Sequence, residues 1–343
     1  MRELCLGFTL RLSGCVAVRG PSIIAVNDGD IRVLGAQVPP GSSLTVPVGR
    51  AVIVEGNGDL SVNGQLEPCD GESLKAIEGV VEEVRGARRI ILVGPSDSGK
   101  STLAAYLYNS GAVNSVISTD VGQNEVYCPG FEALSMPRRP FLPGSPQDQP
   151  LSACLVGDFT PRGLEGRYMS CAIRLSRLSG SFVIDTDGWV SQEGVELKAA
   201  LSLAVNADAV VAIGLDSDAV VALRHEKAGP LVAVPRLAPA SKSVPERRAN
   251  RDRLIASCIM RSKRRTLRLE GLAMEGRGPG EDWQGLLVGL EGPGSDYFGV
   301  VERGPSRSGA ITVISEYLGD VTAVKLGRAR VDLGAFSGLI GQA

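Results

Sequence analysis

The chain has 343 residues, of which 43% are hydrophobic and 22% are charged, and its formal net charge is −2. This composition is typical of a globular protein with two or three domains. The near-neutral charge excludes a global positive field that would attract nucleic acid, so any anionic partner must be bound by local patches. The single histidine, His225, argues against a histidine pair or a histidine-rich metal site.

Seven scattered cysteines include no C-x-x-C pair. This pattern favours reduced thiols in a cytoplasmic protein over a metal or disulfide role. No apolar stretch reaches the roughly 18 residues that span a bilayer, and the N-terminal MRELCLGFTLRLSG has no cleavable apolar core. We therefore expect no contact with a membrane and no signal peptide.

Residues 1–85 contain short alternating runs such as SIIAV and AVIVEG, separated by glycine, proline and asparagine. This spacing predicts an N-terminal β-sandwich-like domain or small barrel. Apolar residues at three- and four-residue steps predict a helix over 72–86. Residues 261–343 return to β-like runs and glycines, which predict a small C-terminal β domain.

Residues 86–260 alternate between strand and helix patterns, which predicts an α/β domain with a mostly parallel sheet and helices on both faces. The predicted strands lie at 89–93, 113–119, 152–157, 181–185, 209–214 and 231–234, and the helices at 100–110, 163–179, 192–206 and 217–227. Between Cys128 and Pro150 the chain is rich in proline, which predicts a long surface excursion without regular helix or central strand.

The stretch GPSDSGKST, residues 94–102, lies between a predicted strand and a predicted helix and fits G-x-x-x-x-G-K-[ST]. In such a loop, backbone N–H groups cradle phosphates and the helix N-terminus adds positive potential. We expect Lys100 to reach the β- and γ-phosphates and the Ser101 hydroxyl to bind Mg²⁺, with Thr102 as the alternative ligand. The nucleotide contacts then fall on Gly94, Pro95, Ser96, Asp97, Ser98, Gly99, Lys100, Ser101 and Thr102.

Two aspartates stand at the ends of predicted strands. Asp120 follows 113–119 and Asp185 ends 181–185, where side chains project over the ligand crevice of an open α/β sheet. Each could instead cap the turn that follows it. The sequence DTDG at 185–188 also reads as the D-x-x-G element of a GTPase, but the chain lacks the N-K-x-D and T-K-x-D motifs that read guanine.

Several cationic and aromatic residues are candidates for contacts with an anionic substrate. Arg247 and Arg251 lie one turn apart if the segment after Pro245 is helical, and arginines above a P-loop neutralise a transferring phosphoryl group. A solvated charged helix is the alternative. Trp189 could stack on a nucleobase or pack as a core or rim aromatic. The basic runs at 138–139 and 261–268 could follow a phosphodiester backbone.

Together these motifs resemble the archaeal polynucleotide 5′-hydroxyl kinases and the eukaryotic RNA kinases of pre-mRNA cleavage and ribosomal RNA processing. GPSDSGKST resembles the family P-loop, TDVGQ at 119–123 its D-x-G-Q element, FTPRG at 159–163 its Thr-Pro clasp and DTDGW at 185–189 its T-x-G-W element. The segment near 242–253 falls where the family has an arginine-rich lid. Lys242 stands there in place of a further arginine of some relatives, and lysine cannot fork onto phosphate as arginine does.

The resemblance implies an α/β fold with a central P-loop NTPase domain, over 86–260, between two small β domains. It implies transfer of the γ-phosphoryl group of ATP, with Mg²⁺, to a polynucleotide 5′-hydroxyl. Lys100, Arg247 and Arg251 would act on the transferring group, and Asp120 would be the base that accepts the hydroxyl proton. Asp185 would help to order Mg²⁺ or cap its turn.

On the acceptor side, the resemblance implies that Gln123 and Trp189 flank the terminal base and that Thr160 and Pro161 fix the acceptor end. The acceptor would be RNA, with DNA as a further candidate, and RNA-processing proteins are candidate partners. Two alternatives stay open from the residues alone. One is an ATP-binding scaffold subunit of an RNA-processing complex, and the other is a P-loop GTPase.

Overall fold

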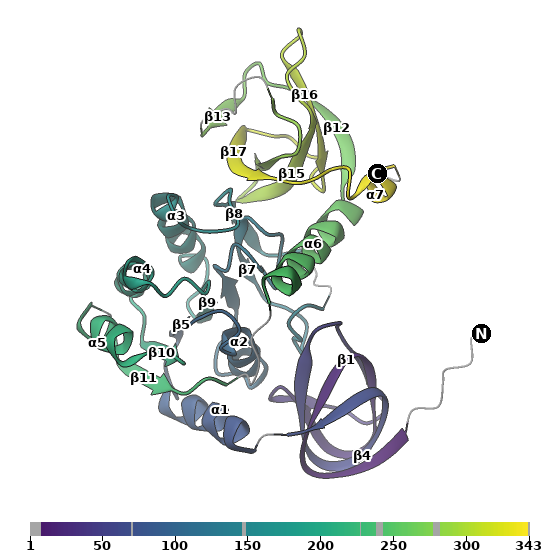
Figure 1. The fold of residues 1–343 in the computed structure, drawn as a ribbon, viewed down its shortest axis with the longest axis vertical. Coiled ribbons are helices and arrows are strands. Elements are labelled where there is room, and N and C mark those ends of the chain that lie inside the picture. Colours follow the sequence, from purple (N-terminus) through teal and green to yellow (C-terminus); the bar gives the residue numbers. More distant parts are fainter. Residues whose placement is uncertain are drawn as a thin grey trace. The chain divides into compact units, whose positions relative to one another are not determined.

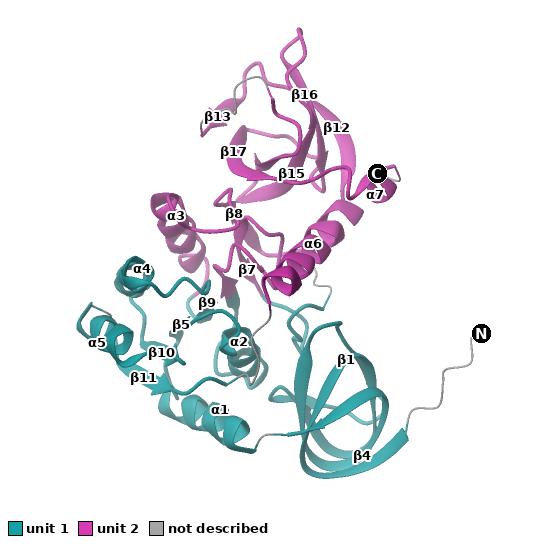
Figure 2. Ribbon diagram, viewed as in Figure 1, with its two compact units in different colours: residues 1–116, 136–148, 180–241 teal, residues 117–135, 149–179, 242–343 magenta. Residues whose placement is uncertain are grey.

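The computed structural model describes residues 8–69, 71–145, 149–226, 228–237, 243–276 and 282–341. The chain forms two compact units (Figure 2). Unit 1 consists of residues 1–116, 136–148 and 180–241, and unit 2 of residues 117–135, 149–179 and 242–343. The division into consecutive domains 1–85, 86–260 and 261–343 stays a prediction.

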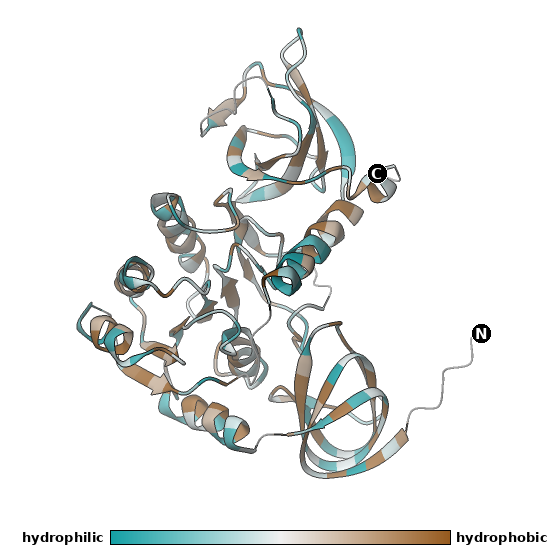
Figure 3. Cartoon of the chain, in the orientation of Figure 1, coloured by the Kyte–Doolittle hydropathy of each residue, from teal (hydrophilic) through white to brown (hydrophobic). Residues whose placement is uncertain are grey.

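The N-terminal part of unit 1 is an antiparallel sheet dominated by two long, bent strands (Figure 1). These are β1 (Phe8–Val33) and β4 (Ala51–Pro68), with the short strands β2 (Ala36–Val38) and β3 (Ser43–Val46) paired to β1. Apolar and polar residues alternate along both long strands (Figure 3). The glycines that suggested strand ends are bends instead: Gly56 has φ +128°, and a Cβ there would lie 2.0 Å from the Asp30 carbonyl oxygen.

The rest of unit 1 contains four parallel strands. Strands and helices alternate along this part of the chain, as predicted. The spatial order of the four strands is β11 (Leu231–Val234), β10 (Ala209–Ile213), β5 (Arg89–Val93) and β9 (Phe182–Asp185). The helices are α1 (Gly71–Glu83), α2 (Lys100–Asn109), α4 (Gln192–Ala204) and α5 (Ser217–Glu226). Strands β9 and β10 are buried along their whole length, as expected for strands of a parallel sheet covered on both faces.

Unit 2 begins within β6 (Val116–Ser118) and contains β7 (Phe131–Ser135), which pairs antiparallel with β8 (Ser152–Leu155). The prediction of an excursion without a central strand is therefore wrong for 131–135. These residues, FEALS, lie between Pro129 and Pro137 and contain no proline, so every residue of β7 keeps its N–H for the ladder. Two helices complete this part, α3 (Glu165–Ser176) and α6 (Val244–Met260).

The C-terminal part of unit 2 is a six-stranded sheet with the order β12-β16-β15-β14-β17-β13. The strands are β12 (Lys263–Arg268), β13 (Ala273–Glu275), β14 (Leu286–Gly292), β15 (Ser295–Arg303), β16 (Ala310–Ser315) and β17 (Ala323–Arg330), followed by α7 (Ser337–Ile340). Its core is a cluster of buried Leu, Ile and Val side chains from β12, β14, β15, β16 and β17. The predicted C-terminal β-rich region is therefore present.

Cysteine pairing is the clearest departure from the sequence interpretation. The structure contains the disulfides Cys15–Cys69, Cys128–Cys258 and Cys154–Cys171, so the prediction of reduced thiols is wrong for these six residues. The partners are 54, 130 and 17 positions apart, and only the fold brings them together. The cytoplasmic location loses the support of reduced thiols and stays a prediction. None of the helices in the described ranges is long and apolar enough to cross a membrane.

Candidate functional site: a phosphate loop and a lid-side cluster

The phosphate loop of unit 1, residues 94–102, joins β5 to α2. Lys100 is 5% exposed, and its Nζ donates to the carbonyl oxygens of Gly94 and Pro95 at 2.8 Å each. Asp97 and Gly99 both adopt positive φ, +59° and +103°. Residues in alternating backbone conformations turn successive N–H groups toward one point and form an anion-binding concavity. The loop thus has the predicted form of a phosphate cradle.

Glycine is required at the start of the loop, because a Cβ on Gly94 would lie 2.3 Å from the Ile213 carbonyl oxygen. Arg236, in the segment after β11, contacts the loop with its side chain. Arg236 Nη2 donates to the carbonyl oxygens of Ser96 and Asp97 at 3.2 and 3.0 Å. Sequence reasoning missed this support, since nothing local marks a residue 139 positions further along the chain as a partner of the loop.

Asp185 lies at the end of β9 beside the loop, and its carboxyl group is buried. Burial raises the pKa of Asp185, while the Lys100 ammonium and a hydrogen bond to the Ser101 side chain oppose that rise. Arg50, in the connection between β3 and β4, also lowers it, and sequence reasoning missed this residue. A carboxylate hydrogen-bonded to the P-loop hydroxyl is the oxygen donor set that Mg²⁺ takes in P-loop proteins. The arrangement therefore fits Asp185 as a metal-site residue.

The turn after Asp185 is built from buried polar groups. Thr186 Oγ1 donates to the Leu92 carbonyl oxygen at 2.7 Å, which fixes the turn to β5. Asp187 Oδ1 accepts from the Trp189 backbone N–H at 2.7 Å and from Lys198 Nζ at 2.8 Å. A Cβ on Gly188 would lie 2.1 Å from Ser96 Oγ, so glycine is needed where this turn meets the phosphate loop.

The Trp189 side chain is only partly buried. Its indole N–H donates to Ser191 Oγ at 2.6 Å, and Lys198 Nζ lies 5.6 Å from the ring centroid. A ring that is part-exposed argues against a core aromatic, and both base stacking and a rim position stay predictions.

In unit 2, Asp120 heads the segment after β6. Its Oδ1 accepts from the backbone N–H groups of Gly122 and Gln123, each at 3.0 Å. The alternative reading of a turn cap is therefore present in the structure. Turn capping and a catalytic role are compatible, because each oxygen of a carboxylate can accept more than one hydrogen bond.

Helix α6 confirms the conditional prediction of a helix after Pro245. Ser243 and Glu246 form a capping box at its start, with Pro245 in the first turn, and such a start stabilises a helix. Arg247 and Arg251 accordingly share one face. Lys242 lies outside the described residues.

Contacts within unit 2 bring α6 next to two of the predicted elements. Asn250 Nδ2 donates to Gln123 Oε1 at 2.9 Å, and the Arg251 guanidinium lies 4.8 Å from the Phe159 ring centroid. A Cβ on Gly122 would lie 3.0 Å from the Phe159 carbonyl oxygen. We call Asp120, Gln123, Phe159, Asn250 and Arg251 the lid-side cluster.

Thr160 and Pro161 follow Phe159 directly, in the loop of residues 157–163 that we call the clasp loop. Thr160 Oγ1 accepts from the Arg162 backbone N–H at 3.4 Å, and Pro161 is buried. The predicted site residues thus gather in two groups. Lys100, Ser101, Asp185 and Trp189 belong to unit 1, and Asp120, Gln123, Thr160 and Arg251 belong to unit 2.

The basic run at 261–268 engages partners within unit 2. Arg261 and Arg264 pair with Glu316 and Glu302 at 3.5 and 2.7 Å. Arg265 donates to the carbonyl oxygens of Tyr317 and Gly319. In the other predicted basic run, the Arg139 guanidinium lies over the Tyr108 ring at 4.7 Å. These contacts favour a structural role over a groove that follows a nucleic-acid backbone.

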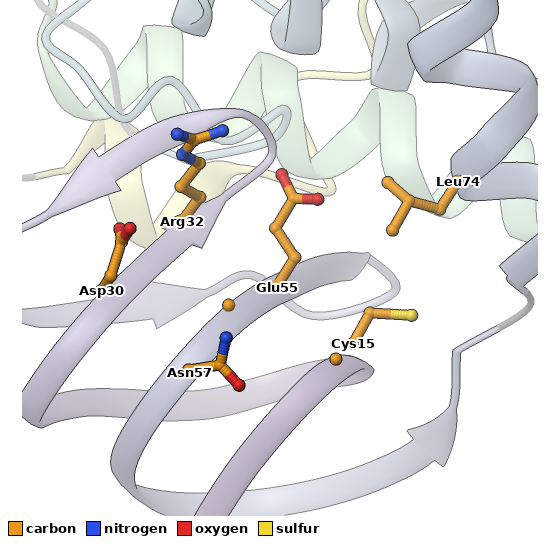
Figure 4. A pocket seen from close by; sticks show the side chains of 8 residues that line it. Cys15, Asp30, Arg32, Glu55, Asn57 and Leu74 are labelled. Carbon is orange, nitrogen blue, oxygen red and sulfur yellow. The ribbon is translucent and has the colours of Figure 1, made fainter.

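A separate cavity of about 400 Å³ lies in the N-terminal part of unit 1 (Figure 4). It is lined by Cys15, Asp30, Arg32, Glu55, Asn57 and Leu74, among others. Glu55 accepts a hydrogen bond from the Tyr106 hydroxyl. Burial, and next the charge of Glu55 and this contact, raise the pKa of Tyr106 well above its usual value. None of the predicted site residues lines the cavity, so it adds nothing to the phosphate loop.

Fold and loop together define a P-loop nucleotide-binding protein. Residues 94–259 match the family model described as the P-loop of mRNA cleavage and polyadenylation factor CLP1. This match confirms the resemblance that the motifs indicated for this segment.

Curated relatives include a polyribonucleotide 5′-hydroxyl-kinase of Pyrococcus furiosus, 32% identical over 133 residues, which are 36% of this chain and 37% of the relative. A CLP1 homolog of Arabidopsis thaliana is 30% identical over 143 residues, 36% of this chain and 32% of the relative. The matches thus span less than two fifths of the length of either relative.

Solved structures extend the likeness of fold to nearly the whole chain. A Clp1p chain in complex with Pcf11p has a TM-score of 0.68 at 13% identity, and the match covers 95% of this chain and 99% of that chain. The predicted α/β fold with a P-loop domain and additional β regions is therefore confirmed.

Proposed function

We propose that the protein is an ATP-dependent polynucleotide 5′-hydroxyl kinase. The observation that carries the proposal is the match of residues 94–259 to the CLP1 P-loop model. This segment contains Lys100, Asp120, Arg247 and Arg251. Five archaeal relatives bear the name polyribonucleotide 5′-hydroxyl-kinase. That name supports RNA as the acceptor, with DNA as a further candidate.

The phosphate loop is the proposed ATP site. Lys100 exchanges its bonds to the Gly94 and Pro95 carbonyl oxygens for the β- and γ-phosphates. The Ser101 hydroxyl and the Asp185 carboxylate are the groups that would hold Mg²⁺, which would neutralise charge between these phosphates. A Clp1p structure that concerns the loss of ATP in a point mutant supports ATP as the nucleotide.

Asp120 is the proposed base. The 5′-oxygen of the acceptor forms a bond to the γ-phosphorus, the bond between that phosphorus and the β–γ bridging oxygen breaks, and ADP leaves. The hydroxyl proton passes to Asp120, whose backbone bonds hold the carboxylate at a fixed angle. Arg247 and Arg251 neutralise the charge on the transferring group, while Gln123, Thr160, Pro161 and Trp189 hold the acceptor end.

The Clp1p structures contain Pcf11p as a partner. By analogy, we propose that an RNA-processing protein binds this chain. We also propose that the kinase is cytoplasmic.

Transfer of label from [γ-³²P]ATP to a 5′-hydroxyl oligoribonucleotide tests the proposal. Labelled oligonucleotide is the expected product, and an oligonucleotide with a 5′-phosphate should accept nothing. Phosphate release that is indifferent to the oligonucleotide would instead make the protein an NTPase, and GTP in place of ATP tests the GTPase alternative. Tight ATP binding without either product would make it a scaffold. A DNA oligonucleotide of the same sequence measures the preference between acceptors.

A further inference from the structure

The C-terminal β strands contact the clasp loop through its first residue. Gly157, at φ +95°, accepts at its carbonyl oxygen from the backbone N–H groups of Arg328 and Ala329 in β17, at 2.6 and 3.0 Å. A Cβ on Gly157 would lie 2.7 Å from the Gly327 Cα. The two backbones approach so closely that only glycine fits at this point.

The side chain of Arg328 then reaches across the clasp loop. Its Nε lies 3.5 Å from Asp158 Oδ2, and its Nη2 donates to the Arg162 carbonyl oxygen at 2.8 Å. A Cβ on Gly163 would lie 3.2 Å from Arg328 Nη1. One guanidinium thus contacts the loop at both ends, before and after Thr160 and Pro161. A planar guanidinium donates in several fixed directions, which suits it to such bridging.

The clasp loop also contacts other members of the lid-side cluster through Phe159, which belongs to both. Phe159 lies under the Arg251 guanidinium, and its carbonyl oxygen is close to Gly122. The position of Thr160 and Pro161 relative to Asp120 and Arg251 therefore depends on where the loop is held, and Arg328 is the side chain that bridges its two ends.

We propose that Arg328 is a positioning residue that holds the clasp loop in its acceptor-binding conformation, so that the C-terminal β strands are part of the acceptor site. The proposal rests on the function proposed above. It assigns to β17 a part in acceptor affinity and none in nucleotide binding.

Arg330 provides a matched control. It lies two residues further along β17, is similarly exposed, and donates to the carbonyl oxygens of Gln284 and Asp282 rather than to the clasp loop. Arg328→Ala and Arg330→Ala therefore remove the same side chain from the same strand and differ in the contact that is lost.

Steady-state kinetics should separate the two variants. Arg328→Ala should raise the KM for the oligonucleotide about tenfold, because the loss of a charged hydrogen bond weakens the held conformation. Its kcat at saturating acceptor and its KM for ATP should stay within about twofold of the original chain. The KM of Arg328→Lys for the oligonucleotide should lie between those of the original chain and Arg328→Ala, because a single ammonium cannot fork between Asp158 and the Arg162 carbonyl. A variant that is merely poorly folded would lose kcat at unchanged KM. Equal KM values for Arg328→Ala and Arg330→Ala would overturn the proposal.

Amide hydrogen exchange gives a readout that needs no activity. In Arg328→Ala the amides of Phe159, Thr160, Arg162 and Gly163 should exchange several-fold faster than in the original chain, whereas Arg330→Ala should leave them unchanged. Unchanged exchange in both variants would refute the holding role, even if the original chain transferred no phosphate. Absence of transfer by the original chain would refute the proposed kinase function alone.

Discussion

The phosphate loop of unit 1 and the lid-side cluster of unit 2 are built on different principles. At the phosphate loop the two charged groups are buried: Lys100 is 5% exposed, and Asp185 beside the loop is 3% exposed. In the lid-side cluster every member is part-exposed and several meet through single side-chain contacts. A rigid buried site suits a ligand whose phosphates are always the same. A looser arrangement suits an acceptor whose bases vary, so the two regions should respond differently to substitution.

The largest effect should come from Asp120→Asn. An asparagine oxygen can still accept from the Gly122 and Gln123 N–H groups, so the turn is kept and only the proposed base is lost. We expect kcat to fall about 10²–10⁴-fold, the range of general base catalysis, with unchanged affinity for ATP by titration. Asp216→Asn is the matched control, because Asp216 caps the Ala219 N–H at the start of α5. Near-normal kcat in Asp120→Asn would mean that the base lies elsewhere.

Lys100→Ala tests the buried side of the comparison. Removing the ammonium that we propose contacts the ATP phosphates should lower kcat about 10²–10³-fold, as for the loss of one group that stabilises transition-state charge. Oligonucleotide binding, measured by fluorescence anisotropy without nucleotide, should not change. The exposed Lys75→Ala on α1 serves as the control. Loss of oligonucleotide affinity in Lys100→Ala would show that the two regions are not independent in function.

Much of the phosphate loop could be predicted, since its conformation is encoded in consecutive residues. Gly94, Gly99 and Lys100 stand at fixed spacings, and the capping box of Ser243 and Glu246 marks the start of α6 just as locally. Each of these signals needs only a short window of sequence, because backbone conformation and helix capping are local effects.

What sequence could not supply are the long-range supports. Arg50, Arg236 and Arg328 reach the site from distant elements, and an isolated arginine on a surface strand or loop carries no local signal. Strand β7 was not predicted for a related reason. A high density of prolines indicates a loop on average, but it says little about a short interval without proline. The disulfide partners were likewise joined only by the fold.

A smaller loss of activity is expected from Trp189→Ala. This variant sharpens the comparison because the part-exposed Trp189 ring belongs to unit 1, which also holds the phosphate loop. Loss of base stacking costs about 1–3 kcal/mol, or about 5–150-fold in acceptor affinity, while ATP affinity should be unchanged. Trp283→Phe is the control, because Trp283 packs against the core of the C-terminal sheet. An equal loss of affinity for both ligands would instead indicate collapse of the Asp187 turn.

Asp185→Asn should change the free energy of unfolding only slightly. It should nevertheless reduce metal-dependent transfer strongly. Burial raises the pKa of Asp185, so ionisation is costlier in the folded than in the unfolded chain, and stability falls as pH rises through the folded pKa. At neutral pH the nucleotide-free variant should therefore melt above the original chain, by about 2–4 °C for each kcal/mol of relieved cost. The gap should close as the pH falls and the wild-type carboxyl group takes up its proton.

Asp208→Asn gives the opposite sign within the same unit. A hydrogen bond from Arg89 is the main cause that lowers the pKa of Asp208, so its contribution to stability is present above the unfolded pKa and is lost as pH falls. This variant should melt below the original chain at neutral pH, and that gap should also close toward acid. Thermal melts of both variants across the acidic range decide the matter. If Asp185→Asn also melted lower at neutral pH, the buried carboxylate would be a net stabilising partner of Lys100 and Ser101, and the phosphate loop would not be a site that gives up stability for metal binding.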